Sequence, residues 1–277
     1  KAYNISFSSK QSLMEGRNKG KKWCLLAAAY DKSMMRTKVG MHLGEIFDKV
    51  AAPEDHYVEV YLNGTLMGLY DMCEPADNGR SDIDYDDSAE SDELMFELEN
   101  GTKDNVYDRD EIRDGAMYYN APSSNVRYVT EDLEDEVLAL VDSYTEEYNY
   151  NTYLAKLQTD LASNAKYANW TSTIKDADYA IRNYKSNKMF DYIDIDSFVD
   201  MYLVNEVMNT VDFNYSSVKY YIKNVNGQPK IFAGCIWDFD LSTGNSYYSG
   251  VRVYNEFRAQ TNPWFMYLMR NEKFLIV

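Results

Sequence analysis

Alternating hydrophobic and polar positions predict β-strands in the N-terminal part of the chain. The stretch AYNISF alternates, and the apolar run KWCLLAAAY predicts a short buried strand. In HYVEVYLNGTLMGLYDMCEPAD, two alternating runs flank Asn63-Gly64, a residue pair typical of type I′ turns. We therefore expect a β-hairpin around this pair, and another short strand at LMFELEN.

Helical spacing predicts two well-defined helices. The first lies in DKSMMRTKVGMHLGEIF, with Asp31 or Ser33 as its N-cap and an apolar stripe of Met35, Val39, His42, Leu43 and Ile46. The second lies in DIDSFVDMYLVNEVMNTVD, capped by Asp194 or Asp196, with a buried stripe of Phe198, Met201, Tyr202, Met208 and Val211. Weaker patterns predict helices at 130–148, 150–163 and 186–192.

A second hairpin is predicted in SVKYYIKNVNGQPKIFAGCIWDFD, close to several polar side chains. Because a hairpin brings its own ends together, the loop with Asp212 and Asn214 should lie beside Asp238 and Asp240. Carboxylate and amide oxygens that converge in this way suit a hard divalent cation, Mg²⁺ or Mn²⁺. Asp240 taken alone is equally consistent with a turn or cap residue.

These elements predict an α+β fold in one domain spanning residues 1–277. A β-rich N-lobe would reach to about residue 115, and a mainly helical C-lobe would cover 116–277. Protein kinases use a comparable hairpin to place a catalytic Asp near a metal-binding Asp. Asp212 resembles the first of these, and Asp238-Phe239 resembles the second, with Asp240 in the place of a Gly. The pattern therefore favours a two-lobed, atypical kinase-like architecture.

Composition narrows the possible partners. Asp and Glu total 45 against 28 Lys and Arg, which gives a formal net charge of -17. Such a surface repels phosphate backbones and anionic lipids, so nucleic-acid binding is not expected. No apolar run of about 18 residues that could span a membrane occurs. The chain contains no signal peptide, and we expect it to be part of a longer protein, because it begins and ends inside structural patterns.

Cysteine and histidine offer few candidates for zinc binding or for nucleophilic and acid–base catalysis. The three cysteines lie in apolar contexts without CxxC spacing, which predicts buried free thiols and disfavours a zinc site. Only two histidines are present, so histidine-based catalysis has few candidates. The 26 tyrosines, together with many Asn and Asp, are a composition common in secreted proteins of low-GC bacteria.

A kinase also needs a cation at the nucleotide phosphates. Arg36 lies at a helix start, where the helix dipole favours anions, and arginine binds phosphates bidentately. A solvated helix residue is the alternative reading. Glu74 ends a hairpin strand, where it would pair with Arg36 or border the nucleotide. The alternative is that it is only a charged residue at the strand end before Pro75. The same two interpretations apply to Glu97. No GxGxxG or GxxxxGK[ST] loop is present, which disfavours an ordinary kinase or P-loop enzyme.

Four blocks together resemble the CotH (spore coat protein H) kinase family over nearly the whole chain. They are KKWCLLAAAYDKSMMRTKVG, VEVYLNGTLMGLYDMCEPAD, DIDSFVDMYLVNEVMNTVD and IFAGCIWDFDLSTGN, in this order. The resemblance implies an extracellular or surface-associated atypical kinase that uses ATP with Mg²⁺ or Mn²⁺ to phosphorylate Ser or Thr of secreted proteins. By position it implies that Arg36 is the cation at the nucleotide phosphates and that Asp212 is the catalytic Asp. It also implies that Asp238, together with Asp240 and Asn214, binds the metal. The chain departs from the family in its KNVNGQPK turn and in Gly234-Cys235-Ile236, where many members have Gly-Pro.

Two other functions are compatible with the sequence. The chain is alternatively a non-catalytic pseudokinase, or an adhesion or carbohydrate-binding module within a larger extracellular assembly, since abundant Tyr and Asn suit sugar binding. A glycoside hydrolase using Asp212 and Asp238 as its carboxylate pair is a third reading. Arg36 and the four-block pattern count against that third reading.

Overall fold

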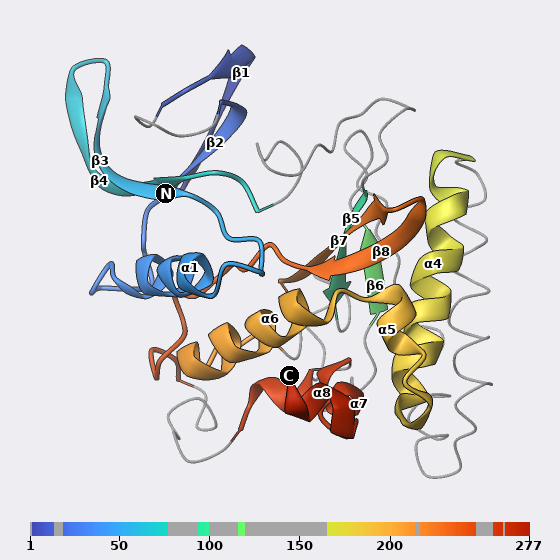
Figure 1. Ribbon diagram of the computed structural model, residues 1–277. Coiled ribbons are helices and arrows are strands. Elements are labelled where there is room, and N and C mark those ends of the chain that lie inside the picture. Colours follow the sequence, from blue (N-terminus) through green and yellow to red (C-terminus); the bar gives the residue numbers. More distant parts are fainter. Residues whose placement is uncertain are drawn as a thin grey trace.

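The protein is a mixed α+β structure, as the sequence predicts. The computed structural model describes residues 2–13, 19–76, 94–99, 116–119, 165–213, 217–247, 257–262 and 264–277. The described strands form two four-stranded antiparallel sheets, and helices pack beside them (Figure 1). The helices predicted at 130–148 and 150–163 lie outside the described residues.

The first sheet is built from two hairpins. Its strands are β1 (Tyr3–Gln11), β2 (Gly20–Leu26), β3 (Asp55–Leu62) and β4 (Thr65–Cys73), in the order β1-β2-β4-β3. The β3–β4 turn is formed by Asn63 and Gly64, whose φ angles of 49° and 81° are both positive. A type I′ turn requires positive φ at both positions, so the predicted hairpin is confirmed.

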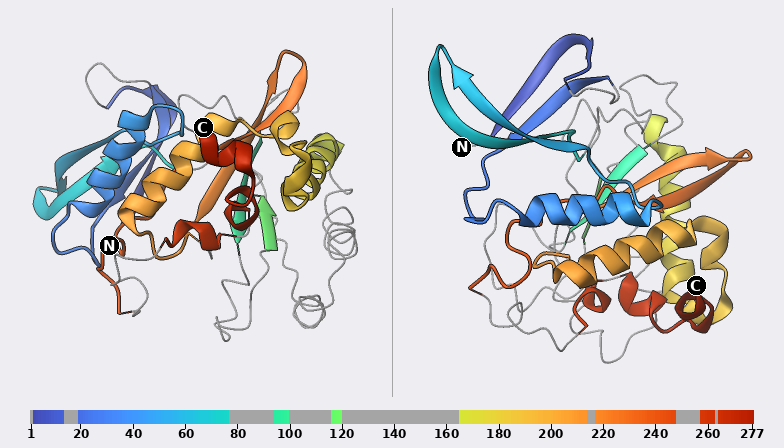
Figure 2. Two further views of the ribbon diagram at one scale, coloured as in Figure 1. Left: turned by 60° about the horizontal axis from the view of Figure 1, so that its bottom comes forward. Right: turned by 60° about the vertical axis from the view of Figure 1, so that its left-hand side comes forward.

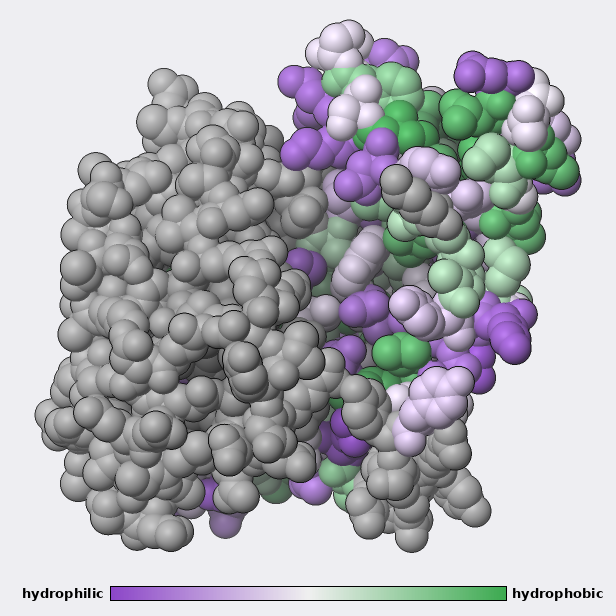
Figure 3. Space-filling model, turned by 180° about the vertical axis from the view of Figure 1, so that it is seen from behind, coloured by the Kyte–Doolittle hydropathy of each residue, from purple (hydrophilic) through white to green (hydrophobic). Residues whose placement is uncertain are grey.

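One face of the first sheet covers a small hydrophobic cluster, whereas the β3–β4 hairpin is mostly solvated. The cluster consists of Trp23, Leu25, Tyr70 and Met72. The apolar side chains of the hairpin that remain exposed include Tyr61, Leu62, Leu66 and Leu69. Seen from behind, hydrophobic residues gather over this part of the molecule (Figure 3). The hairpin therefore contributes little to the main core.

The second sheet joins strands from distant parts of the chain. It contains β5 (Leu94–Glu99), β6 (Ala116–Tyr119), β7 (Val218–Val225) and β8 (Gln228–Ala233), in the order β6-β5-β7-β8. The predicted β7–β8 hairpin is confirmed, and its second strand ends at Ala233, five residues before Asp238. β5, which was expected with the N-terminal strands, pairs with β7. The division between the sheets therefore falls before β5, not near residue 115.

The described helices are short apart from three. They are α1 (Arg36–Phe47), α4 (Ala165–Arg182), α5 (Met189–Tyr192), α6 (Ile195–Met208), α7 (Phe265–Leu268) and α8 (Glu272–Ile276). α4 was not predicted from the sequence. α1 and α6 run side by side, and α1 connects β2 to β3 (Figure 2). Within the described ranges, no helix has both the length and the apolar character needed to cross a bilayer.

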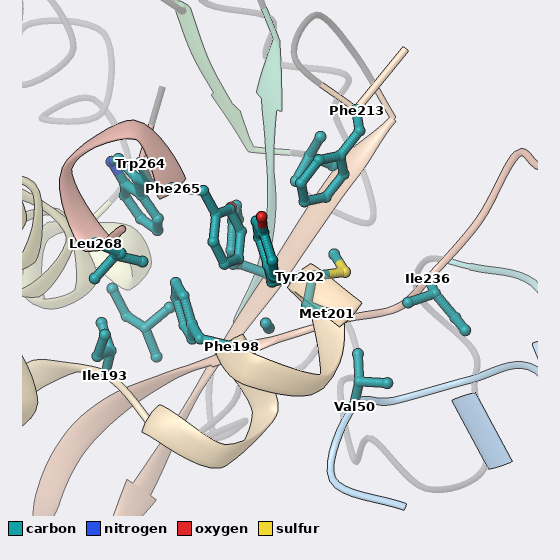
Figure 4. Packing of buried hydrophobic residues seen from close by; sticks show 14 of the residues in the cluster. Val50, Ile193, Phe198, Met201, Tyr202, Phe213, Ile236, Trp264, Phe265 and Leu268 are labelled. Atoms are coloured by element: carbon teal, nitrogen blue, oxygen red, sulfur yellow. The ribbon is translucent and has the colours of Figure 1, made fainter. Parts of the chain in front are cut away.

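α6 is the central helix of the main core. Its N-cap is Asp194, whose Oδ1 accepts a hydrogen bond of 3.0 Å from the Ser197 N–H, and Asn209 ends it in the left-handed conformation. Its predicted apolar stripe is buried. Phe198 stacks on Tyr220 of β7 and on Trp264, with ring centroids 5.4 and 6.1 Å apart (Figure 4). This aromatic packing holds the N-terminal half of α6 against β7, and Asp212 follows the other end of the helix.

α1 buries a different face from the one its apolar residues predict. Met35, Val39 and Ile46 are exposed, whereas Gly40, Met41 and Gly44 are buried. A Cβ atom on Gly40 would lie 2.3 Å from the Phe239 ring, and one on Gly44 would lie 2.3 Å from the Ile236 side chain. The two glycines therefore let the α1 backbone lie directly against the segment that carries Asp238.

Candidate active site

The segment after β8 holds Asp238 between two aromatic residues. Phe239 is fully buried beneath Gly40, and Trp237 is half-buried. Asp238 adopts a left-handed φ of 68°, which Asp tolerates better than most residues. Ser217, just before β7, donates a hydrogen bond of 3.1 Å to Asp238 Oδ2. Packing on one side and the start of β7 on the other thus position this carboxylate.

Asp240 is a half-buried carboxyl that is affected by the charges of three other carboxylates. Burial, and then the charges of Asp238, Asp212 and Asp31, raise the pKa of Asp240 to about 6, while a hydrogen bond from the Leu241 N–H opposes this. Asp212 therefore lies within electrostatic range of the WDFD segment, as the hairpin argument predicts. Such a group of like charges favours either protonation or a bound cation.

The loop that carries Asp212 is held by Arg258, a residue that the sequence analysis did not single out. The Arg258 guanidinium donates to the carbonyls of Thr210 and Val211 at 3.3 and 2.8 Å. Glu206 accepts hydrogen bonds of 2.8 and 2.7 Å from the N–H groups of Arg258 and Ala259. Burial lowers the pKa of Arg258, although Asp212 and Glu206 oppose this shift. No sequence pattern links these distant residues.

Asp31 and Arg36 form an ion pair at the start of α1. Arg36 Nη1 lies 2.5 Å from Asp31 Oδ1, which also accepts from the Ser33 hydroxyl at 2.6 Å. Burial would raise the pKa of Asp31, but hydrogen bonds from Ser33 and Arg36 outweigh it and lower that pKa. The prediction of Asp31 or Ser33 as N-cap was wrong in position, because Met35 is the cap residue. Asp31 Oδ2 nevertheless accepts from the Arg36 N–H at 2.9 Å and so satisfies the first turn.

Arg36 also reaches the loop after the WDFD segment. Its Nε donates to the Ser242 carbonyl and to the Thr243 hydroxyl, both at 3.0 Å. Asn245 closes the same loop by donating to the carbonyls of Asp240 and Tyr30 at 2.7 and 2.8 Å. In the described contacts, the Arg36 guanidinium therefore joins α1 to the loop that follows Asp240.

We expect Arg36→Lys to destabilise the protein by roughly 1–3 kcal/mol, because an ammonium group cannot donate to Asp31 and the 242–243 loop in the same fork. Denaturant unfolding measures this effect. Arg270→Lys, at an exposed position, is the matched control and should stay within about 0.5 kcal/mol of the parent. An Arg36→Lys stability equal to the parent's would show that other contacts hold the loop.

A cavity of about 280 Å³ opens between the first sheet, α1 and the WDFD segment. Its lining combines apolar residues with carboxylates: Ala2, Leu26, Ala27, Ala28, Ala29, Tyr30, Asp31, Met34, Thr37, Asp71, Trp237, Asp238 and Asp240. Four of these described lining residues are Asp, and none is Lys or Arg. We call this space the acidic cavity. An anionic ligand would need an accompanying cation to enter it.

The other predicted site residues either do not line the acidic cavity or lie outside the residues that the structure describes. Arg36, Asp212 and Glu74 do not line it. Glu74 is buried at the end of β4, where its N–H donates to the Glu54 carbonyl at 3.0 Å. Asn214 lies outside the described residues, and the Glu97 side chain is likewise not described.

A second cavity, of about 360 Å³, shares Trp237 with the acidic cavity. It is lined by Asn4, Ser6, Lys22, Trp23, Cys24, Pro75, Ala76, Lys219 and Trp237. Sequence analysis did not identify Lys22 or Lys219 as cavity residues, because they come from different sheets and no spacing in the sequence links them. Trp237 thus lines one cavity that holds acidic side chains and another that holds two lysines.

Asp71 is a buried carboxyl that the sequence analysis also missed. It is 3% exposed, and neither of its oxygens accepts a hydrogen bond from the described donors. Its polar neighbour is the Asp55 carboxyl on β3, which pairs with Lys38 of α1 at 2.8 Å. Burial and Asp55 raise the pKa of Asp71 to about 7, and Lys38 opposes this. Two adjacent carboxyls can form a hydrogen bond with each other when one of them is protonated and donates its proton to the other.

We expect Asp71→Asn to stabilise the protein by roughly 1–3 kcal/mol above pH 7, where the wild type buries an unpaired charge. The folded pKa of about 7 exceeds the ordinary 3.8, so wild-type stability falls as pH rises between these values. The advantage of Asp71→Asn should therefore be absent near pH 4 and complete above pH 7. Urea unfolding across this range measures it, and a pH-independent difference would contradict the assignment.

The carboxylates fit a divalent cation that is shared with a ligand. Among the described residues, no three His, Cys, Asp or Glu side chains are grouped closely enough to hold an ion by themselves. Asp238 and Asp240 nevertheless both line the acidic cavity, and burial, followed by the charge of Asp238, raises the pKa of Asp240. Mg²⁺ typically takes one or two carboxylates and completes its shell with waters and substrate phosphates.

The arrangement is that of an α+β protein with a carboxylate-lined cavity beside a β-sheet. The family model described as CotH kinase protein matches residues 1–275. The chain therefore belongs to the CotH kinase family, and the resemblance seen in the four sequence blocks is confirmed. No curated protein matches the chain.

Proposed function

We propose that this protein is an atypical kinase that transfers phosphate from ATP, with Mg²⁺ or Mn²⁺, to Ser or Thr of proteins. The observation that supports this most is the acidic cavity, where Asp238 and Asp240 lie together and Asp212 lies within electrostatic range. Membership of the CotH kinase family agrees with it.

We further propose that the fold is two-lobed and kinase-like, within a single domain. The first sheet with α1 would be the N-lobe, and the second sheet with α4 to α8 would be the C-lobe. Both parts contribute to the acidic cavity, since Leu26 and Asp71 come from the first sheet and Trp237 to Asp240 follow the second. A nucleotide in this cavity would contact both lobes, as in protein kinases.

In the proposed mechanism, Asp212 accepts the proton of the Ser or Thr hydroxyl as that oxygen bonds to the γ-phosphorus of ATP and ADP leaves. Asp238 and Asp240, with Asn214, would hold the metal. The metal, when bound, neutralises charge on the phosphate oxygens. Arg36 would add positive charge through its first-turn position. The Asp212 loop is fixed by Arg258, so the proton acceptor is held in place before the substrate arrives.

We propose an extracellular or cell-surface location, within a larger multidomain assembly. The support is the family and the acidic, Tyr-rich composition. The acceptor would be a secreted or surface protein. The net charge of -17 disfavours nucleic acid as a partner.

Incubation with γ-labelled ATP, Mn²⁺ and a Ser-rich peptide tests the proposed reaction. We expect label on the peptide from the wild type and none from Asp212→Ala. If no label is transferred with either Mn²⁺ or Mg²⁺, or if transfer survives the Asp212→Ala substitution, the proposed mechanism is wrong.

A non-catalytic pseudokinase is the second candidate. It is favoured by one observation, the absence of Lys and Arg from the described lining of the acidic cavity. This reading predicts that ATP with metal raises the melting temperature by mass action but that no label is transferred. An adhesion or carbohydrate-binding module would instead be stabilised by an oligosaccharide and by no nucleotide.

A further inference from the structure

Two reduced thiols face each other across the junction of the two N-terminal hairpins. Cys24 of β2 and Cys73 of β4 are direct partners in the antiparallel ladder. Directly opposed residues project from the same face of a sheet. The two thiols are hydrogen-bonded to each other, and none of the three cysteines is in a disulfide.

The strand register brings this pair into disulfide geometry. Directly opposed residues of antiparallel strands have Cα atoms about 4.5 or 5.5 Å apart, depending on the kind of pair. Disulfides form across Cα separations of about 4.4–6.8 Å. We propose that Cys24 and Cys73 are a disulfide-forming site that small disulfides of the glutathione type oxidise. Separations in this range let two cysteines be bridged without a change in the strand register.

Cys24 is the thiol that an oxidant reaches first. It is half-buried and lines the second cavity, whereas Cys73 is fully buried. The hydrogen bond to Cys24, and then burial, raise the pKa of the Cys73 thiol, which keeps it protonated. The Cys24 thiolate is therefore the first nucleophile, since thiol exchange proceeds through the thiolate.

The reaction is balanced by the oxidant. Cys24 Sγ attacks one sulfur of the small disulfide, forms a mixed disulfide and releases one small thiol. Cys73 then loses its proton and attacks Cys24 Sγ, which releases the second small thiol. The two protein thiols lose two protons and two electrons, and the S–S bond of the oxidant is reduced to two thiols.

The bond would reinforce a narrow junction beside the acidic cavity. β2 and β4 are joined by three residue pairs, Cys24 with Cys73, Leu25 with Met72, and Leu26 with Asp71. The last of these pairs lines the acidic cavity. Oxidation would therefore fix the sheet next to the cavity wall, and the oxidised protein should unfold at a higher denaturant concentration than the reduced one.

Intact-mass analysis of the full chain tests the proposal. The reduced protein is incubated with oxidised glutathione, quenched in acid, and alkylated after unfolding. We expect the wild type to lose two of its three alkylatable thiols with no glutathione attached. Peptide mapping should then show Cys24 joined to Cys73.

Three single variants serve as controls. Cys235→Ser should still lose two thiols, because Cys235 lies in the other core, with its thiol directed at the Ile236 carbonyl at 3.6 Å. Cys73→Ser should instead keep glutathione on Cys24, and Cys24→Ser should form no intramolecular bond. Three remaining thiols, a stable glutathione adduct in the wild type, or a bond that includes Cys235 would each overturn the proposal.

Discussion

Replacing Asp212 by Asn is expected to lower the rate of phosphate transfer by roughly 10²–10⁴-fold, the usual contribution of a positioned general base. Asn keeps the shape of the side chain but cannot accept the hydroxyl proton. Asp212 does not line the acidic cavity, so the affinity for ATP and metal should be little changed. Steady-state kinetics with a Ser-containing peptide separates the two effects, because kcat should fall while KM for ATP is maintained.

The matched control for this experiment is Asp191→Asn, which changes an exposed carboxylate of α5. It should leave both kcat and KM unaltered. A kcat for Asp212→Asn equal to the parent's would exclude Asp212 as the proton acceptor. An equal loss of ATP affinity and rate would instead assign Asp212 to nucleotide binding.

Replacing Gly40 by Val is expected to destabilise the protein by about 1–3 kcal/mol, the usual cost of overpacking a core. The new Cβ would lie 2.3 Å from the Phe239 ring, so either α1 or the WDFD segment must move. Movement of that segment displaces Asp238 and Asp240. We therefore also expect the stabilisation by ATP and Mn²⁺, followed as a shift in melting temperature, to be lost.

His42→Val is the control for Gly40→Val, because it places the same side chain on the same helix at a position that is 65% exposed. It should change the free energy of unfolding by no more than about 0.5 kcal/mol. The double variant Gly40→Val with Phe239→Leu should recover part of the lost stability, since the two side chains occupy one space. Strictly additive effects of the two substitutions would refute the proposed contact.

The parts of the fold that local signals specify were predictable. The Asn63-Gly64 turn, the cap at Asp194 and the apolar stripe of α6 each depend on a few neighbouring residues. The approach of Asp212 to Asp240 was also predictable, because a hairpin must bring its ends together. These inferences needed no knowledge of distant contacts.

The buried face of α1 was not predictable, because it is formed by Gly40 and Gly44 together with Met41, and not by the apolar stripe that helical spacing selects. Hydrophobic periodicity selects Met35, Val39 and Ile46, yet the helix packs through Gly40 and Gly44. A helix face cannot be predicted from its large apolar side chains where the helix packs through a close approach of its backbone to a neighbouring segment.

Contacts between remote segments account for most of the remaining differences. In the sequence, Asp71 has the pattern of a solvent-exposed strand residue. Only the three-dimensional structure shows that it is buried beside Asp55. Arg36 was predicted to be a phosphate cation from its position at a helix start. Its hydrogen bonds to Ser242 and Thr243 join segments more than two hundred residues apart, which no local pattern reveals.

The most direct test of a nucleotide site at Asp238 is titration calorimetry of ATP, with and without Mn²⁺, against the wild type and Asp238→Asn. We predict that the wild type binds ATP when Mn²⁺ is present and much more weakly without it, because the described cavity lining offers carboxylates and no cation. Asp238→Asn should lose the metal-dependent binding. Metal-independent binding, or equal affinity in Asp238→Asn, would contradict the proposal that this carboxylate holds the metal for the nucleotide.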